Sequence, residues 1–520
     1  MSRVTKQALT ALAVAIGFAI PFAEARITKI EITSTETPTF KDSLGAARSF
    51  GSAGAYEKLR GRAHGEIDPR DSRNAVITDI ELAARNANGK VPYSMDIYIL
   101  KPVNLALGNR KTYMEVNNRG GKLFGSFNGS GGGNNPTTAA DAGDAFLMNQ
   151  GYSLVWSGWD ISAAPGGDRL TINVGPPLKN ADGSPITGPS YEYIVFDNAT
   201  TTTSPLAYPA ATLDKSKATL TVRDHLMDTP VPVSAAGWSY NATGTAINLI
   251  NGTLAAPFKQ SAIYEFSYTA KDPVVAGLGL AATRDFIAFL KHAIADDFGT
   301  PNPLAGAAQQ VYTFTVSQPA RFLNDFQNLG FNADEQGRRV IDGILNWIGG
   351  GNGVNINYRF AQPARTERNR QNHRYAEAPF PFAYQKLRDH LTHKVAGRGI
   401  ACQGERYRHS HDHDDDDDRD DDDDDRDHRH NTCPKAMEVN SSNEYWVKTG
   451  SLLHTDTRGR DLRDPKNVRF YLLSSVEHTG GGALPNSPGV CQQPRNTTDP
   501  NPALRALFVA LDQWVTKGVK

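Results

Sequence analysis

One serine lies where the sequence changes from a β-strand pattern to a helix pattern. The apolar run 311–316 ends at Ser317, and the segment 322–329 carries apolar residues at the spacing of one helical face. A serine at such a junction can present its hydroxyl over the end of a sheet, where the N–H group of the next residue, Gln318, can stabilise an oxyanion. Ser317 is therefore a candidate nucleophile for acyl transfer, and a serine that only caps the helix is the alternative.

The residues around Ser317 depart from the usual G-x-S-x-G signature of such serines. Thr315 and Pro319 occupy the two glycine positions. Thr315 places a β-branched side chain where the turn is crowded. Pro319 has no N–H group, but proline is tolerated in the first turn of a helix. The sequence leaves open whether these two substitutions reduce activity.

The order of residues along the chain supports the candidate. A serine nucleophile of this kind requires an acid after a later strand and a histidine after the last strand. The strand-like run 435–439 leads to Glu444, and the run 468–473 leads to His478. We therefore predict a catalytic triad of Ser317, Glu444 and His478.

Three other acids compete with Glu444. Asp456 is the strongest alternative, although it lies beyond a helical stretch that is expected to carry the chain away from the strand ends where Ser317 lies. Glu477 is adjacent to His478, and neighbouring side chains on an extended segment point apart. Asp342 requires its strand to end early.

A glycine-containing loop is the candidate second part of an oxyanion site. Arg119, Gly120 and Gly121 follow an early strand-like run that ends at Val116. Glycines allow backbone N–H groups to approach a substrate oxygen closely. A plain turn is the alternative interpretation.

The rest of the chain alternates strand patterns with helix patterns. Apolar strand-like runs occupy 113–116, 152–156, 311–316, 340–345, 435–439 and 468–473. Helix-period segments cover 286–290, 322–329 and 504–514. This alternation predicts an α/β fold in which helices cover both faces of a mostly parallel central sheet, and we assign it to residues 111–520. The site of such a fold lies at the carboxyl ends of the strands.

Three further segments differ from this plan. Period-two runs at 27–32, 76–80 and 95–100 predict a β-rich N-terminal region, 26–110, that packs on the main domain. Residues 163–266 are rich in Thr, Pro, Gly and Asn and predict a β-rich insertion, either a passive excursion or a lid and substrate wall. Residues 403–432 contain a run of Asp, Arg and His that cannot form a core and is expected to be disordered.

The three cysteines fit an oxidising compartment with at most one bridge. Cys402 and Cys433 flank the acidic run, and a bridge between them would hold the two ends of the run together. Three unpaired thiols are the alternative. The spacing of Cys and His residues suggests no zinc site, and no other metal or cofactor is expected.

The first 25 residues have the features of a signal peptide. A short positive region precedes the apolar run 8–22, and a small-x-small cleavage site follows at 23–25. We therefore expect export to the periplasm or the cell exterior, and no membrane span after the signal is removed. The formal net charge of −1 gives no field that would attract nucleic acid.

The chain resembles the family of exported, mostly uncharacterised bacterial α/β-hydrolase domain-containing proteins. The resemblance covers nearly the whole chain after the signal. Its landmarks are FGSAGAYE (50–57), GEIDP (65–69), NRGG (118–121), SGW (157–159), SQ (317–318), RFL (321–323), GFN (330–332), PFPFAY (379–384) and NSSNEYW (440–446). The resemblance implies an α/β-hydrolase fold with Ser317, Glu444 and His478 in the triad positions.

Together these features predict a secreted serine hydrolase that cleaves a small carboxylic ester through an acyl-enzyme. A catalytically impaired binding protein on the same scaffold is one alternative. An acyltransferase or peptidase with the same triad is the other. The sequence identifies neither the acyl part nor the alcohol part of the ester, and it does not give the oligomeric state.

Overall fold

The computed structural model describes residues 26–129, 132–363, 380–403, 431–478, 481, 492–494 and 496–520. The predicted signal peptide, 1–25, lies outside the described residues, as does residue range 404–430 of the predicted acidic insertion 403–432. Within the described part, no helix is both long and apolar enough to cross a bilayer.

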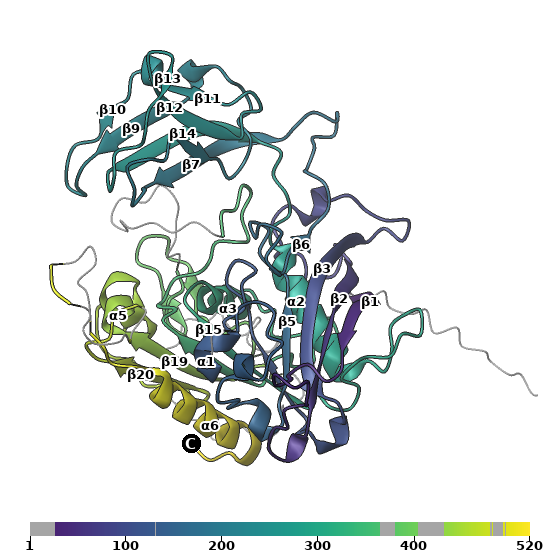
Figure 1. The fold of residues 1–520 in the computed structure, drawn as a ribbon. Coiled ribbons are helices and arrows are strands. Elements are labelled where there is room, and N and C mark those ends of the chain that lie inside the picture. The colour runs from purple at the N-terminus through teal and green to yellow at the C-terminus, as the bar shows by residue number, and fades with distance from the viewer. Residues whose placement is uncertain are drawn as a thin grey trace, which may run out of the picture.

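A ten-stranded sheet forms the centre of the molecule (Figure 1). Its strands are β1 (Arg26–Glu36), β2 (Tyr56–Ile67), β3 (Val91–Pro102), β4 (Lys111–Met114), β5 (Ser153–Ser157), β6 (Ile172–Asn173), β15 (Gln310–Val316), β16 (Gly343–Trp347), β19 (Lys435–Ser441) and β20 (Val468–Leu473). The order is β1-β2-β3-β5-β4-β15-β16-β19-β20, and β6 pairs with β3. The six strands from β5 to β20 in this order are parallel, whereas β1, β2 and β3 join them by antiparallel pairing. The sheet is therefore mixed. The predicted N-terminal region 26–110 was expected to pack on the main domain, and it does so by adding β1, β2 and β3 to one edge of the central sheet.

Helices cover both faces of the sheet. One apolar core contains side chains of α2 (Leu278–His292) and α3 (Gln318–Asn328), and a second contains side chains of α1 (Phe124–Asn128) and α6 (Asn501–Lys517). Successive residues of one strand enter different cores, as Ile344 and Leu345 do in β16. Burial on two faces explains why the parallel strands are continuous apolar runs in the sequence.

The predicted insertion forms two small antiparallel sheets with a core of their own. Its strands are β7 (Thr187–Ile194), β8 (Thr203–Pro205), β9 (Thr219–Arg223), β10 (Val231–Pro232), β11 (Trp238–Tyr240), β12 (Ala246–Asn251), β13 (Leu254–Ala255) and β14 (Ile263–Lys271). Figure 1 shows these sheets as a separate block at the top of the view, above the main sheet. The predicted boundaries, 163–266, need correction at both ends, because β6 belongs to the main sheet and β14 continues to Lys271.

One N-terminal strand expected from the sequence was wrong, and another strand was missed. The expected strand 76–80 is absent from the described structure. The chain turns there, with a positive φ of 62° at Asp79, and the N–H of Thr78 donates to the side chain of Asn357 instead of to a strand partner. Conversely, the sequence patterns gave no signal for β2, which pairs along its length with both β1 and β3.

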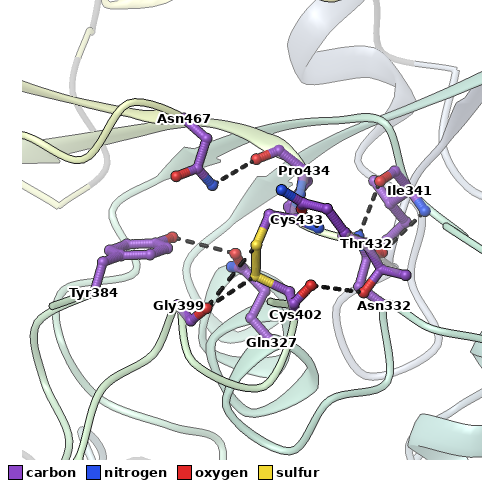
Figure 2. Close-up of a disulfide and its surroundings, with 11 residues drawn as sticks. Gln327, Asn332, Ile341, Tyr384, Gly399, Cys402, Thr432, Cys433, Pro434 and Asn467 are labelled. Carbon is purple, nitrogen blue, oxygen red and sulfur yellow. Dashed lines mark hydrogen bonds between the residues drawn. A yellow bond between two sulfur atoms is a disulfide. The ribbon is translucent and has the colours of Figure 1, made fainter. Parts of the chain in front are cut away.

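A disulfide joins Cys402 to Cys433 just before β19 (Figure 2). The segment before it contains a two-stranded ribbon of β17 (Leu387–Arg388) and β18 (Val395–Ala396). The N–H of Thr432 donates to the carbonyl of Cys402 at 2.9 Å, and the Asn332 side chain donates to the carbonyl of Thr432 at 2.6 Å. The residues that flank the acidic segment therefore lie side by side, with 4.8 Å between the two cysteine Cα atoms.

We expect removal of this bridge to destabilise the protein. The two cysteines are 31 residues apart, and closing a loop of that length lowers the entropy of the unfolded chain enough to contribute about 3–4 kcal/mol. The double variant Cys402→Ala/Cys433→Ala should lose about this much free energy of unfolding in a denaturant titration. Cys491→Ala removes the third cysteine and is the matched control. Equal stability of the double variant and the wild-type protein would contradict the structural role of the bridge.

Candidate functional site

Ser317 lies between β15 and α3 in an unusual backbone conformation. Its φ is 66° and its ψ is −114°, a combination that costs a non-glycine residue about 1–3 kcal/mol. Its N–H donates to the carbonyl of Trp347 in the neighbouring strand at 3.0 Å, and its carbonyl accepts the N–H of Arg321 in the first turn of α3. The sharp turn is thus fixed on both sides, and it presents the serine side chain above the carboxyl end of β15.

The Ser317 hydroxyl is in hydrogen-bond contact with His478, which follows β20. The distance from Ser317 Oγ to His478 Nε2 is 2.9 Å, and His478 Nδ1 lies 2.5 Å from Glu444 Oε1. A carboxylate oxygen can only accept, so the Nδ1 atom must carry the ring proton. Nε2 is then the acceptor that faces the Ser317 hydroxyl, which is the tautomer required of a general base.

Glu444 is fully buried and is held in place by its own short helix, α5 (Ser442–Val447). The Asn443 side chain donates to Oε1 at 2.7 Å, and the Ser441 hydroxyl donates to Oε2. Burial by itself raises the pKa of the Glu444 carboxyl. The hydrogen bond and charge of His478, then the Ser441 hydroxyl and the Lys448 ammonium, outweigh burial and lower this pKa to about 2. Glu444 is therefore a carboxylate at any pH near neutrality.

Two of the rival acids, Asp456 and Asp342, have partners elsewhere. Asp456 forms an ion pair with Arg460 at 2.8 Å and accepts backbone N–H groups of its own turn. Asp342 pairs with Lys291 at 2.9 Å and lies at the opposite, amino end of β16. Glu444, in contrast, contacts the histidine ring directly.

Gln318 is the first residue of α3, so its backbone N–H has no partner within the helix. Its buried side chain donates to Asp160 Oδ2 at 3.0 Å and to the carbonyl of Pro363 at 2.7 Å. These two bonds fix the first turn of the helix beside Ser317. Asp160 was not among the predicted site residues, although its position just beyond β5 was a usable signal.

The loop after β4 differs from the prediction. Asn118 and Gly121 exchange both backbone hydrogen bonds at 2.9 Å, and the N–H of Gly120 donates to the Asn117 side chain at 2.9 Å. Arg119 and Gly120 take positive φ angles of 49° and 79°, as in a tight turn. The N–H groups of Gly120 and Gly121 are therefore committed within the loop, and the expectation that they face a substrate oxygen is corrected.

Thr315 is accommodated by a polar row that crosses the sheet. Its hydroxyl donates to Asn346 Oδ1 at 2.6 Å, and the Asn346 amide donates to both oxygens of Glu438 at 3.2 Å. Glu438 also accepts the Tyr384 hydroxyl at 2.6 Å. All four side chains are buried. The threonine at the first glycine position thus has a specific partner in the next strand.

Lys448 is a further residue of the site that was not predicted from the sequence. Its ammonium lies 3.3 Å from Glu444 Oε1 and 3.3 Å from His478 Nδ1. A signal was available, because Lys448 is four residues after Glu444 and side chains at that spacing meet on a helix. No group of three or more His, Cys, Asp or Glu side chains suited to a metal ion occurs among the described residues.

Comparison with known families gives one match. A family model described as an alpha/beta hydrolase domain matches residues 258–520, which cover α2, the parallel strands from β15 onward and all three residues of the Ser317–His478–Glu444 chain. Comparison with curated proteins and with solved structures gave no significant match.

The polar row makes Thr315 and Thr313 a matched pair for testing. Thr315→Val keeps the side-chain shape but leaves the buried Asn346 oxygen without its donor, so we expect a loss of about 1–3 kcal/mol in the free energy of unfolding. Thr313 is equally buried in the same strand, and its hydroxyl has no hydrogen-bond partner among the described residues. Thr313→Val should therefore be nearly neutral in the same denaturant titration. Equal losses in the two variants would show that the row is not a stabilising network.

Proposed function

Because the chain belongs to the alpha/beta hydrolase domain family, we propose that it is a serine hydrolase that cleaves carboxylic esters through an acyl-enzyme. The observation that carries the proposal is the continuous contact from Ser317 Oγ through both ring nitrogens of His478 to Glu444 Oε1, at 2.9 and 2.5 Å. A serine paired with a base, which is itself oriented by a third group, is the arrangement that activates a hydroxyl for attack on a carbonyl.

The reaction follows from the atoms in contact. Ser317 Oγ attacks the ester carbonyl carbon while its proton passes to His478 Nε2. The tetrahedral intermediate collapses, and the protonated ring gives this proton to the departing alcohol. Water then attacks the acyl-enzyme with His478 as base, which releases the carboxylic acid and restores the serine. Glu444 keeps the ring in the required tautomer and stabilises its positive charge.

Backbone N–H groups would stabilise the oxyanion. The N–H of Gln318 is suitable, because it sits at the N-terminus of α3 beside the attacking oxygen and also gains from the helix dipole. We retain Arg119 as the position for a second donor, in a loop held near β5 by a 2.8 Å bond from the Trp159 indole to the Asn117 carbonyl.

The same triad could transfer the acyl group to an alcohol instead of water or cleave an amide, and these remain the alternatives within the proposal. We also propose that the protein acts outside the cytoplasm on a small-molecule ester. The disulfide between Cys402 and Cys433 supports this location, since such bonds persist mainly in oxidising compartments.

Ser317 has the most direct test. Ser317→Ala should abolish cleavage of p-nitrophenyl esters, with a loss in kcat on the order of a million-fold, because no other hydroxyl contacts His478 in the described structure. A fluorophosphonate probe should label the wild-type protein and not the variant. Labelling of the variant, or an unchanged rate, would show that a different residue is the nucleophile.

The identity of the acid is tested by a pair of isosteric variants. Glu444→Gln should keep the fold but lose the preferred ring tautomer, which lowers kcat by about ten-thousand-fold. Asp456→Asn removes an acid that forms an ion pair with Arg460, so the kcat of this variant should match that of the wild-type enzyme. A large loss in Asp456→Asn with normal turnover in Glu444→Gln would mean that the acid is wrongly assigned.

A further inference from the structure

Lys448 is the residue directly after α5, and both its backbone and its side chain contact Glu444 of that helix. Its backbone N–H donates to the carbonyl of Glu444 at 3.1 Å, and its Nζ atom lies 3.3 Å from the Oε1 oxygen of the same residue. The side chain is only 14% exposed, so the ammonium is shielded from most of the solvent. Its second neighbour at 3.3 Å is Nδ1 of His478.

The contact between Lys448 and His478 is not an ordinary hydrogen bond. His478 Nδ1 carries the proton that faces Glu444 Oε1 at 2.5 Å, so it has no lone pair to offer an ammonium. His478 and Asn443 donate to Glu444 Oε1, and the Lys448 ammonium forms an ion pair with the same oxygen at 3.3 Å. The acid that must stabilise a charged imidazole thus also faces the Lys448 ammonium.

This arrangement has a definite electrostatic consequence. When Ser317 loses its proton, the ring of His478 becomes positive, and the Lys448 ammonium lies next to it at 3.3 Å. Like charges at this distance disfavour the protonated ring, while the Glu444 carboxylate favours it. The Glu444 carboxylate and the Lys448 ammonium both contact the ring at Nδ1, and Glu477 is the neighbour of His478 in the chain.

We propose that Lys448 is a positioning residue of the triad, which holds the Glu444 carboxylate on His478 and extends catalysis to lower pH by disfavouring the protonated imidazole. The inference rests on the proposed function, because it assigns His478 the role of a base. Without Lys448, the acid would favour the protonated ring unopposed, and the base would be lost at a higher pH. The depressed pKa of Glu444 agrees with this arrangement, since Lys448 is among its causes.

The kinetic test compares neutral and charged replacements of Lys448. Values of kcat/KM for a p-nitrophenyl ester are measured from about pH 4 to about pH 9, because this profile reports the free enzyme's base. In Lys448→Met and Lys448→Gln, the acidic limb should move upward by about one pH unit. Lys448→Arg keeps the charge and should retain the wild-type limb. A limb that stays in place in both neutral variants, or that moves equally in Lys448→Arg, would overturn the proposal.

A second measurement does not require turnover. In protein with isotope-labelled histidine, the ring signal of His478 is identified by its absence from the spectrum of His478→Gln, and its chemical shift is followed with pH. The midpoint should lie about one pH unit higher in the neutral Lys448 variants than in the wild-type protein. A shifted midpoint without any Ser317-dependent ester cleavage would uphold the role of Lys448 and reject the proposed function. Ser317-dependent cleavage with an unshifted midpoint would reject the role of Lys448 alone.

Discussion

The lateral register of the parallel strands β15, β16, β19 and β20 is the constraint on which the site depends. The last residues of β15 and β16, Val316 and Trp347, lie in register with Val439 and Tyr471, which stand two residues before the ends of β19 and β20. The turns that follow β15, β19 and β20 therefore emerge at one edge, and Ser317, Glu444 and His478 meet there although up to 161 residues separate them. A slip of one residue in any of these strands would move its turn by about 3.3 Å and reverse its side chains.

The buried polar row across β15, β16 and β19 fits this requirement. Thr315, Asn346 and Glu438 are direct neighbours in register, and each hydrogen bond between them links one strand to the next. A slipped strand would leave these polar groups unpaired in the core, at about 1–3 kcal/mol for each group. Tyr384 continues the row into the segment that the disulfide fastens to the start of β19 (Figure 2). The site is thus aligned from inside the sheet as well as by its own contacts.

The contact of Ser317, His478 and Glu444 could be predicted because the signals were local and ordered: a residue after each of three apolar runs. The elements that the sequence concealed depend on tertiary contacts. In β2, Gly61 and Gly65 weaken the strand pattern, yet a Cβ at Gly61 would meet the carbonyl of Glu31 at 1.9 Å and one at Gly65 would meet the ring of Tyr93 at 2.3 Å. The loop of Gly120 was mistaken for a set of free donors, because a pattern of residue types does not show that a side chain of Asn117 already accepts its N–H.

The geometry of Ser317 bears on whether the site has decayed. A serine in a left-handed conformation costs the fold about 1–3 kcal/mol, and such strain persists only where the surroundings enforce it. Here the enforcing contacts include the Trp347 carbonyl on one side and the two bonds of the Gln318 side chain on the other. A chain that needed only the scaffold would lose nothing by relaxing this turn. The strained conformation of Ser317 is present beside Thr315 and Pro319, and this supports the proposed hydrolase over a binding protein on the same scaffold.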